Sequence, residues 1–161
     1  MPNSKIKAQA ELKKIFAAEK KRGKKIVACS GAFDLLHPSH IEFLEKAKRL
    51  GDKLAVFLNS DSYVRTVKGS KRPIYDEKTR AGMIAALEAV DFVLIFKEKT
   101  CLGLLRKLRP HIFAQGQDWG LNCIERPVME KLGGEVRVIK VSRKFTTTKI
   151  INKLKNLRDK F

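Results

Sequence analysis

The sequence predicts an α/β protein with a single Rossmann-like fold, a doubly wound parallel sheet of about five strands with flanking helices. Short apolar runs rich in β-branched and aromatic residues recur along the 161 residues, and stretches with apolar residues at helical spacing separate them. Strands that alternate with helices pair in parallel through right-handed crossovers. A chain of this length buries about two-thirds of its unfolded surface, so we expect one core.

The chain is expected to divide into an N-terminal amphipathic helix, residues 1–22, and a main domain, residues 23–161. Ser4 is the candidate N-cap and Gly23 the stop signal of this helix. Four large apolar side chains recur among lysines in it: Ile6, Leu12, Ile15 and Phe16. We expect the helix to pack on the sheet or on a partner, because this stripe is thin for a membrane-surface helix.

The net charge of +18 is concentrated at the two ends of the chain. Residues 1–25 contribute +7 and residues 143–161 contribute +6, which leaves +5 for the residues between them. A nucleic-acid binder is one interpretation of such a charge. Because no RNA- or DNA-binding motif accompanies it and aromatic residues make up only 7% of the chain, we expect no nucleic-acid partner but attraction of anionic substrates.

Cysteine content and hydropathy indicate the compartment. The three cysteines, Cys29, Cys101 and Cys123, are odd in number and unrelated in spacing, and no basic-then-apolar leader precedes them. No run approaches the ~20 apolar residues that span a bilayer. We therefore expect a soluble protein of the reducing cytoplasm with no membrane partner.

A strand–loop–helix junction organises the chain. The apolar run 26–29 is typical of a buried strand, and a helix is expected after residue 36, with Pro38 in its first turn. Gly31 lets the backbone approach a ligand at the carboxyl end of the strand. His37 and His40 are three residues apart, so they share one face beside the positive end of the helix dipole. The pattern predicts a phosphate site. The alternative is that His37 caps the helix and His40 only packs. A zinc site is less favoured, because no third ligand lies near the two histidines.

The next strand, predicted at 54–58, completes a β-α-β unit and ends at the same edge of the sheet. Asp61 follows it and is expected to hold a ribose or a metal, or to cap a short helix at 61–67. The loop 67–74 then places three cations, Lys68, Lys71 and Arg72, in five residues. We expect this loop to contact phosphate groups.

The second half of the chain repeats the alternation of helices and strands. Helices are expected from Asp76 or Thr79 to Val90, at 101–109 and near 123–132, and strands at 91–96, 111–114 and 135–139. We expect His111 to be structural.

Two further segments carry polar residues to the ligand edge. The loop 115–120 surrounds an acid and the single tryptophan with glycines, and Trp119 is expected either to stack on a sugar or base or to anchor packing. Thr146, Thr147 and Thr148 are expected to open a final helix, whose free N–H groups and hydroxyls form a second anion site.

The run from Gly31 to His40 resembles the signature G-x-F-D-x-x-H-x-G-H of the cytidylyltransferase-like nucleotidyltransferases, with Ser39 in place of the second glycine. Further matches resemble the adenylyltransferase domain of bacterial ADP-heptose synthases over roughly residues 23–155: 59–61, 64–65, 68–69, 72–74, 86–91, 108–110, 133–136 and 147–148. The resemblance implies transfer of AMP from ATP to D-glycero-β-D-manno-heptose 1-phosphate, with release of pyrophosphate, for lipopolysaccharide or other surface-glycan biosynthesis.

The resemblance also implies roles for individual residues. The expected catalytic residues are His37, His40 and Lys68. The expected nucleotide- and phosphate-binding residues are Gly31, Ala32, Phe33, Ser39, Arg72, Gly116, Asp118, Thr146, Thr147 and Thr148. The residues expected to orient the acceptor or the metal ion are Asp34, Asp61 and Trp119. Mg²⁺ is expected with the triphosphate, with no dedicated protein metal site.

Departures from the family pattern leave other functions open. Gln115 stands in place of a lysine and Gln117 in place of a glycine, and the loop 116–119 also resembles glycerol-3-phosphate cytidylyltransferase, which uses CTP. A CTP-dependent enzyme acting on glycerol 3-phosphate or a similar polyol phosphate is therefore the alternative. A third possible function is that of a non-catalytic relative that binds a nucleotide or nucleic acid. Ser39 either crowds the nucleotide or hydrogen-bonds to it, and we expect the contact. A homodimer is a further expectation, by analogy with relatives.

Overall fold

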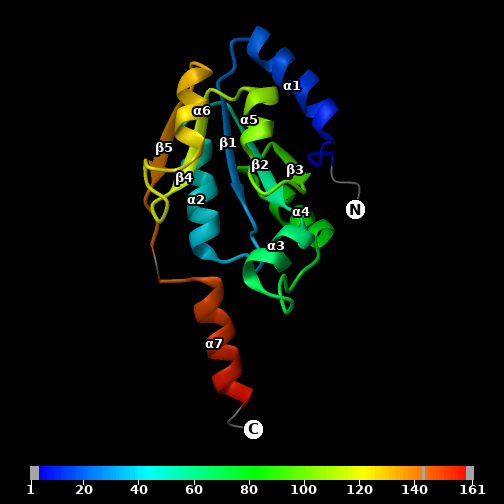
Figure 1. Cartoon of the computed structure of the whole chain (residues 1–161), viewed down its shortest axis with the longest axis vertical. Coiled ribbons are helices and arrows are strands. Elements are labelled where there is room, and N and C mark those ends of the chain that lie inside the picture. Colours follow the sequence, from blue (N-terminus) through cyan, green and yellow to red (C-terminus); the bar gives the residue numbers. More distant parts are fainter. Residues whose placement is uncertain (1–3, 143, 159–161) are drawn as a thin grey trace.

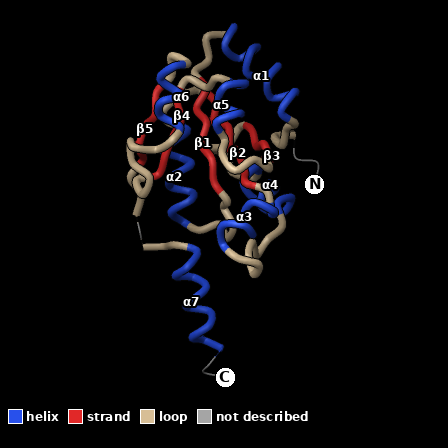
Figure 2. The backbone as a smooth tube through the Cα atoms, in the orientation of Figure 1, coloured by secondary structure: helices blue, strands red, loops and turns tan. Residues whose placement is uncertain are grey.

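A computed structural model describes residues 4–142 and 144–158 and contains a five-stranded sheet in the order β3-β2-β1-β4-β5 (Figures 1 and 2). Every neighbouring pair of strands in it is parallel. The strands are β1 Ile26–Gly31, β2 Lys53–Asn59, β3 Phe92–Phe96, β4 Ile112–Gly116 and β5 Glu135–Ile139. The predicted α/β fold class is confirmed.

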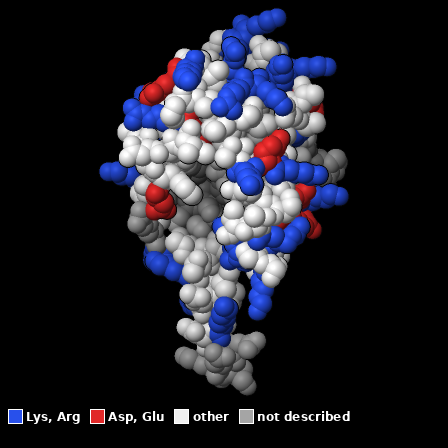
Figure 3. Space-filling model, in the orientation of Figure 1, with Lys and Arg blue, Asp and Glu red and all other residues white. Residues whose placement is uncertain are grey.

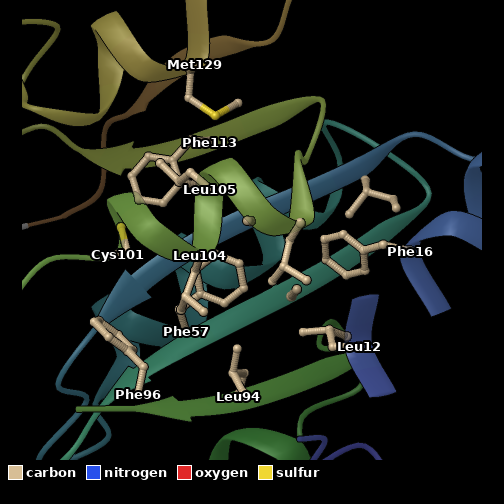
Figure 4. Packing of buried hydrophobic residues seen from close by; sticks show 14 of the residues in the cluster. Leu12, Phe16, Phe57, Leu94, Phe96, Cys101, Leu104, Leu105, Phe113 and Met129 are labelled. Atoms are coloured by element: carbon tan, nitrogen blue, oxygen red, sulfur yellow. The ribbon is translucent and has the colours of Figure 1, made fainter. Parts of the chain in front are cut away.

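Helices cover both faces of the sheet. Within the described residues the helices are α1 Gln9–Lys21, α2 Pro38–Lys48, α3 Asp61–Lys68, α4 Glu77–Ala85, α5 Leu102–Leu108, α6 Glu125–Lys131 and α7 Thr147–Arg158. Side chains of α1, α5 and α6 pack in one hydrophobic cluster, which Figure 4 shows from close by, and side chains of α2 and α4 pack in a second cluster. The helix α7 instead projects away from this body (Figure 1).

Alternation along the central strands explains the two clusters. In β1, Ile26 and Ala28 belong to the first cluster, and Val27 and Cys29 belong to the second. All four side chains are fully buried, because a parallel strand with helices on both faces has no solvated side. This burial accounts for the uninterrupted apolar runs in the sequence.

The N-terminal helix is shorter than its apolar pattern predicts. It begins at Gln9, and its N-cap is Ala8, so the prediction that Ser4 caps it is wrong. Ile6 instead forms a parallel bridge with Val93 of β3. Gly23 does end the helical segment, with a φ of +73° that favours glycine.

Two other helix ends differ from the sequence prediction. The N-cap of α3 is Ser60, whose hydroxyl accepts a hydrogen bond from the backbone N–H of Tyr63, so capping by Asp61 is wrong. The helix α4, capped by Asp76, ends at Ala85 and does not reach Val90.

The order of strands creates a crevice at one edge of the sheet. From β1 the chain proceeds outward to β2 and β3, and it then returns to place β4 against the other side of β1. Ligands of doubly wound sheets bind at such a switch point, outside the carboxyl ends of the strands. The loops 32–37 and 117–124 both start there, after β1 and β4. Within the described part of the chain, no helix combines the length and apolar character needed to cross a membrane.

Candidate functional site

A cleft of about 380 Å³ lies at the carboxyl ends of β1 and β4. The space-filling view shows this face of the molecule hollowed above the start of α7 (Figure 3). Of the site residues expected from the sequence, all line the cleft except Arg72 and Asp61: Gly31, Ala32, Phe33, Asp34, His37, Ser39, His40, Lys68, Gly116, Asp118, Trp119, Thr146, Thr147 and Thr148.

Gly31 makes room for an aromatic side chain of the site. A Cβ atom at Gly31 would lie 2.8 Å from the ring of Phe33. Phe33 itself has a φ of +45°, an uncommon value for a residue with a side chain, and its ring packs edge-on against His40 with the centroids 5.1 Å apart. The glycine therefore acts through Phe33, which in turn fixes the orientation of His40.

The two histidines form a stacked pair at the start of α2. The imidazoles of His37 and His40 lie 3.6 Å apart, centroid to centroid, and are inclined by 18°. The Nδ1 atoms of both rings are buried and have no hydrogen-bond partner among the described residues. Burial lowers the pKa of His37, and burial, His37 and Lys68 together lower the pKa of His40 to about 4. Near neutral pH both rings are therefore uncharged N–H donors.

Asp34 holds the basic loop between α3 and α4 in place. Its buried carboxylate accepts hydrogen bonds from Nε of Arg72 and from the backbone N–H of Ile74, at 2.5 and 2.6 Å. Arg72 thus forms an ion pair with Asp34 and does not line the cleft, and its expected contact with phosphate stays a prediction. Lys68 does line the cleft. Its pKa is lowered mainly by desolvation and, to a smaller extent, by the positive charge of Arg72.

Arg80, in α4, is a residue to which the sequence pattern assigned no part in the site. Its side chain is fully buried. The guanidinium donates to the carbonyl oxygens of Tyr75, Ala32 and Asn59 and to the carboxylate of Asp61. Arg80 therefore ties the ends of β1 and β2 to the basic loop. Asp61 forms an ion pair with Arg80 and lies outside the cleft, so it is not placed to hold a ribose there.

The third wall of the cleft is the segment that leads into α7. Thr146 caps this helix as expected, because its Oγ1 accepts a hydrogen bond from the backbone N–H of Lys149 at 3.2 Å. The hydroxyl of Ser39 donates to the carbonyl oxygens of Ser142 and Phe145, at 2.7 and 3.1 Å. The proton that we expected Ser39 to offer to a nucleotide is therefore used to hold this segment.

Two further residues of α2 hold the same segment. Glu42 accepts a hydrogen bond from the N–H of Ser142, and Lys46 donates to the carbonyl oxygen of Lys140. With Ser39 they occupy one face of α2, at spacings of three and four residues. The position of the Thr146–Thr148 wall thus depends on α2, the helix that carries the histidines.

Trp119 is exposed to the extent of 73%, so it does not anchor packing, and one of the two alternatives for it is wrong. A turn in which its N–H donates to the carbonyl oxygen of Gly116 places it at the edge of the cleft. Nearby, Gln117 donates to the carbonyl oxygen of Val141 at 3.0 Å. An exposed indole at this edge is available to stack on a ring.

A second, larger cavity of about 700 Å³ shares a wall with the cleft. The residues common to both are Ser30, Gly31, Ala32, Lys68, Gln115 and Trp119. Only the second cavity is lined by Glu125, a buried carboxylate. The arrangement provides two compartments for two ligands that meet at the end of β1, and sequence reasoning gave no indication of the second.

Two acidic side chains at this edge, Asp34 and Asp61, were expected to orient a metal ion. Among the described residues no group of three or more histidine, cysteine or acidic side chains is placed to hold a metal ion. Asp34 is bound to Arg72 and a backbone N–H, and Asp61 is bound to Arg80. Both carboxylates that were expected to orient Mg²⁺ are thus bound to arginines, and that role stays a prediction.

A sequence profile described as cytidylyltransferase-like matches residues 28–156, which include both cavities. The chain belongs to the cytidylyltransferase-like family. The resemblance based on the 31–40 motif is thereby confirmed, and the stacked histidines, Lys68 and the threonines at the start of α7 are the features of this member that surround its cleft.

Curated relatives of this cytidylyltransferase-like chain include the bifunctional protein HldE of Pelobacter propionicus and that of Geobacter metallireducens, each 44% identical over 153 residues. These alignments cover 94% of the chain but only 31% of each relative. A lipopolysaccharide core biosynthesis protein from Thermoplasma volcanium, known from its crystal structure, is 31% identical with a TM-score of 0.64. That match covers 76% of this chain and all of the other.

Proposed function

We propose that the protein is an adenylyltransferase that transfers AMP from ATP to D-glycero-β-D-manno-heptose 1-phosphate, giving ADP-heptose and pyrophosphate for surface-glycan or lipopolysaccharide biosynthesis. One observation carries the reaction type: His37, His40, Lys68 and the N-terminus of α7 surround one cleft at the switch point of the sheet. The heptose acceptor is supported by the sequence matches to ADP-heptose synthases and by the identity to the HldE proteins.

The reaction needs positioning and charge neutralisation more than a base. An oxygen of the acceptor phosphate forms a bond to the α-phosphorus of ATP, and the bond from the α-phosphorus to the bridging oxygen of pyrophosphate breaks. The attacking phosphate is already ionised at neutral pH. Catalysis therefore rests on aligning the two substrates and on stabilising the charge that develops on the phosphoryl oxygens.

The side chains of the cleft fit these tasks. The imidazoles of His37 and His40, which are uncharged near neutral pH before the nucleotide binds, offer N–H groups to the triphosphate. Lys68 places a positive charge on the wall that both cavities share. Thr147 and Thr148 offer hydroxyls and the N-terminus of α7 to the β- and γ-phosphates. The acceptor occupies the larger cavity, with its phosphate toward Lys68. Mg²⁺ accompanies the triphosphate and, when bound, offsets its charge.

The compartment and oligomeric state form part of the proposal. We place the protein in the cytoplasm, where ATP is available and where free thiols such as its three buried cysteines persist. A homodimer stays a prediction. Sedimentation at a mass near 18.3 kDa, that of one chain, would contradict it.

The experiment that tests the function is a matrix of substrates. Pyrophosphate release is measured for ATP and CTP, each with D-glycero-β-D-manno-heptose 1-phosphate and with glycerol 3-phosphate, and products are identified by mass spectrometry. ADP-heptose as the main product supports the proposal. CDP-glycerol would establish the cytidylyltransferase alternative. No turnover with any pair, together with salt-sensitive RNA binding, would establish the non-catalytic alternative.

A pair of lysine variants tests the assigned site. Lys68→Met should lower kcat by ~10²-fold or more, as for loss of a preorganised group that stabilises developing charge. Lys71→Met is the matched control, because Lys71 is exposed in the same loop and does not line either cavity. Equal turnover of the two variants would remove Lys68 from the mechanism.

A further inference from the structure

The larger cavity contains a buried carboxylate that the reaction described above does not use. Glu125, in the first turn of α6, is only 8% exposed. Its Oε2 accepts a hydrogen bond from Nε2 of Gln115 at 3.3 Å, and its Oε1 accepts one from Sγ of Cys101 at 3.7 Å. Burial and Glu125 raise the pKa of Cys101 to about 12, so this thiol keeps its proton and acts as a donor.

Neither of these partners carries a positive charge. Among residues 4–142 and 144–157, no lysine, arginine or histidine forms an ion pair with Glu125. A carboxylate has about four acceptor sites, and the two hydrogen bonds described leave about two of them unused. A buried anion with only neutral partners is costly unless further donors reach it. The cavity therefore places unused acceptor capacity where a ligand would lie.

The position of Glu125 selects the part of the ligand that it contacts. It lines the larger cavity but not the cleft, whereas Lys68 lines both. A phosphate group is repelled by Glu125 and attracted to the two lysines of this cavity, Lys68 and Lys99, of which Lys68 alone also lines the cleft where the triphosphate is placed. An acceptor phosphate that reacts there therefore binds at the shared wall. The remainder of the acceptor then extends toward Glu125.

The other side chains of the cavity indicate the chemistry of that remainder. Apart from Lys68 and Lys99, the polar side chains that line this cavity with Glu125 are neutral, and they include Asn59, Tyr63, Thr100 and Asn122; apolar side chains line the rest. Hydroxyl groups are the neutral donors that such a wall can satisfy, and a carboxylate accepts strong charge-assisted hydrogen bonds from them. A ligand without hydroxyl groups at this end would leave Glu125 desolvated without compensation.

We propose that Glu125, held by Gln115 and Cys101, is the specificity residue of the acceptor cavity and accepts hydrogen bonds from hydroxyl groups of a sugar phosphate. The inference rests on the proposed function and deepens it. It assigns the acceptor to the polyhydroxylated monophosphates whose hydroxyl groups extend beyond the reach of the three-carbon glycerol 3-phosphate.

The test compares two isosteric variants on one helix. Glu125→Gln keeps the shape of the side chain and an oxygen for Gln115, but it removes the charge. Glu130→Gln removes the same charge from an exposed position of α6, where Glu130 pairs with Arg126. We expect Glu125→Gln to raise the KM for D-glycero-β-D-manno-heptose 1-phosphate by about 10- to 100-fold, the range for a hydrogen bond to a charged group. The KM for ATP and kcat should stay within about twofold, because binding far from the reacting atoms is lost.

The acceptor supplies a second comparison. For glycerol 3-phosphate, Glu125→Gln should change kcat/KM less than for the heptose phosphate, so the preference of the enzyme for the sugar should narrow. An unchanged KM for the heptose phosphate, or an equal rise for both acceptors, would show that Glu125 only supports α6 and would overturn the inference.

Calorimetry separates this inference from the proposed reaction. If the wild-type protein turns over no substrate pair, the proposed function fails, and titration of the heptose phosphate into each variant still decides the role of Glu125. The role of Glu125 is supported if the heptose phosphate binds equally well to the wild type and to Glu130→Gln but more weakly to Glu125→Gln. Equal binding by all three proteins, or no binding by the wild type, overturns it.

Discussion

Replacement of Ser39 by alanine tests whether the start of α7 is positioned by α2. The change removes the hydroxyl that donates to the carbonyl oxygens of Ser142 and Phe145, 103 and 106 residues away in sequence. It leaves the other two contacts of α2 with this segment, from Glu42 and Lys46, in place. The perturbation is therefore confined to the end of the segment nearest the threonines.

The expected loss of stability is small. A hydrogen bond contributes about 1 kcal/mol net, and alanine recovers up to ~0.5 kcal/mol of helix propensity relative to serine. Because Ser142 and Phe145 are exposed, water can replace the hydroxyl at their carbonyl groups. We expect a net loss of about 0.5–1 kcal/mol in the free energy of unfolding, which corresponds to a fall of about 1–4 °C in Tm for a domain of this size.

The expected effect on the site is larger than this loss suggests. The helix α7 projects from the body of the protein (Figure 1), so the position of its N-terminus depends on the contacts that residues 140, 142 and 145 make with α2. If about 1–1.4 kcal/mol of triphosphate binding depends on that position, the KM for ATP rises about 5- to 10-fold in Ser39→Ala.

The assay measures KM for ATP and Tm for Ser39→Ala and for Ser4→Ala, in which an exposed serine outside the cleft loses the same atom. A lower Tm with an ATP KM within twofold of the wild type would show that the tie is only structural. Tighter ATP binding would show instead that the serine crowds the nucleotide.

Three further predictions follow from the geometry of the site. Arg80→Ala should destabilise the fold by about 3–5 kcal/mol, measured by denaturant unfolding, because it leaves the buried acceptors of the guanidinium without a hydrogen-bond donor. Arg80→Lys should recover little of this loss, since a lysine lacks the forked donor geometry of the guanidinium. A cost of Arg80→Ala below about 1 kcal/mol would contradict this prediction. Trp119→Ala should leave Tm within about 1 °C yet weaken nucleotide or acceptor binding by about 5- to 30-fold, because this indole is exposed until a ligand stacks on it. Acid stability should depend on His40: its pKa is about 4 in the folded protein and 6.5 unfolded, so the stabilisation is present above pH 6.5 and lost as pH falls toward 4, by up to about 3 kcal/mol. His40→Asn should flatten the denaturation profile over that pH range, and an unchanged profile would refute the assignment.

The sequence predicted the strands and the cleft well because both depend on local patterns. Each strand is a short apolar run, buried on both faces, and the loops after β1 and β4 must meet at one edge once the strands are parallel. That topology placed the histidines, Lys68 and the loop of Trp119 in one cleft. No knowledge of side-chain contacts was needed for this step.

The errors arise where distant residues compete for the same groups. Ser4 looked like an N-cap, but the segment containing Ile6 pairs with Val93, some 87 residues away, and delays the helix. Ser60 and Asp61 both suit a cap, and only the fold shows that Arg80 draws Asp61 away. The pairing of Arg72 with Asp34, 38 residues earlier, was likewise not visible in the sequence.

The two departures that looked most damaging to function share one physical character. Ser39 is bound to the backbone of the segment before α7, and Gln115 is bound to Glu125. Each side chain therefore acts on groups of the protein. Ser39 lines the cleft and Gln115 lines both cavities, while His37, His40 and Lys68, which match the family pattern, also line the cleft. Residues that shape walls alter the binding of substrates, and residues that face developing charge alter the rate of the chemical step. Under the proposed function, the matching residues determine the type of reaction, and we predict that the substituted ones determine which substrates this member of the family accepts.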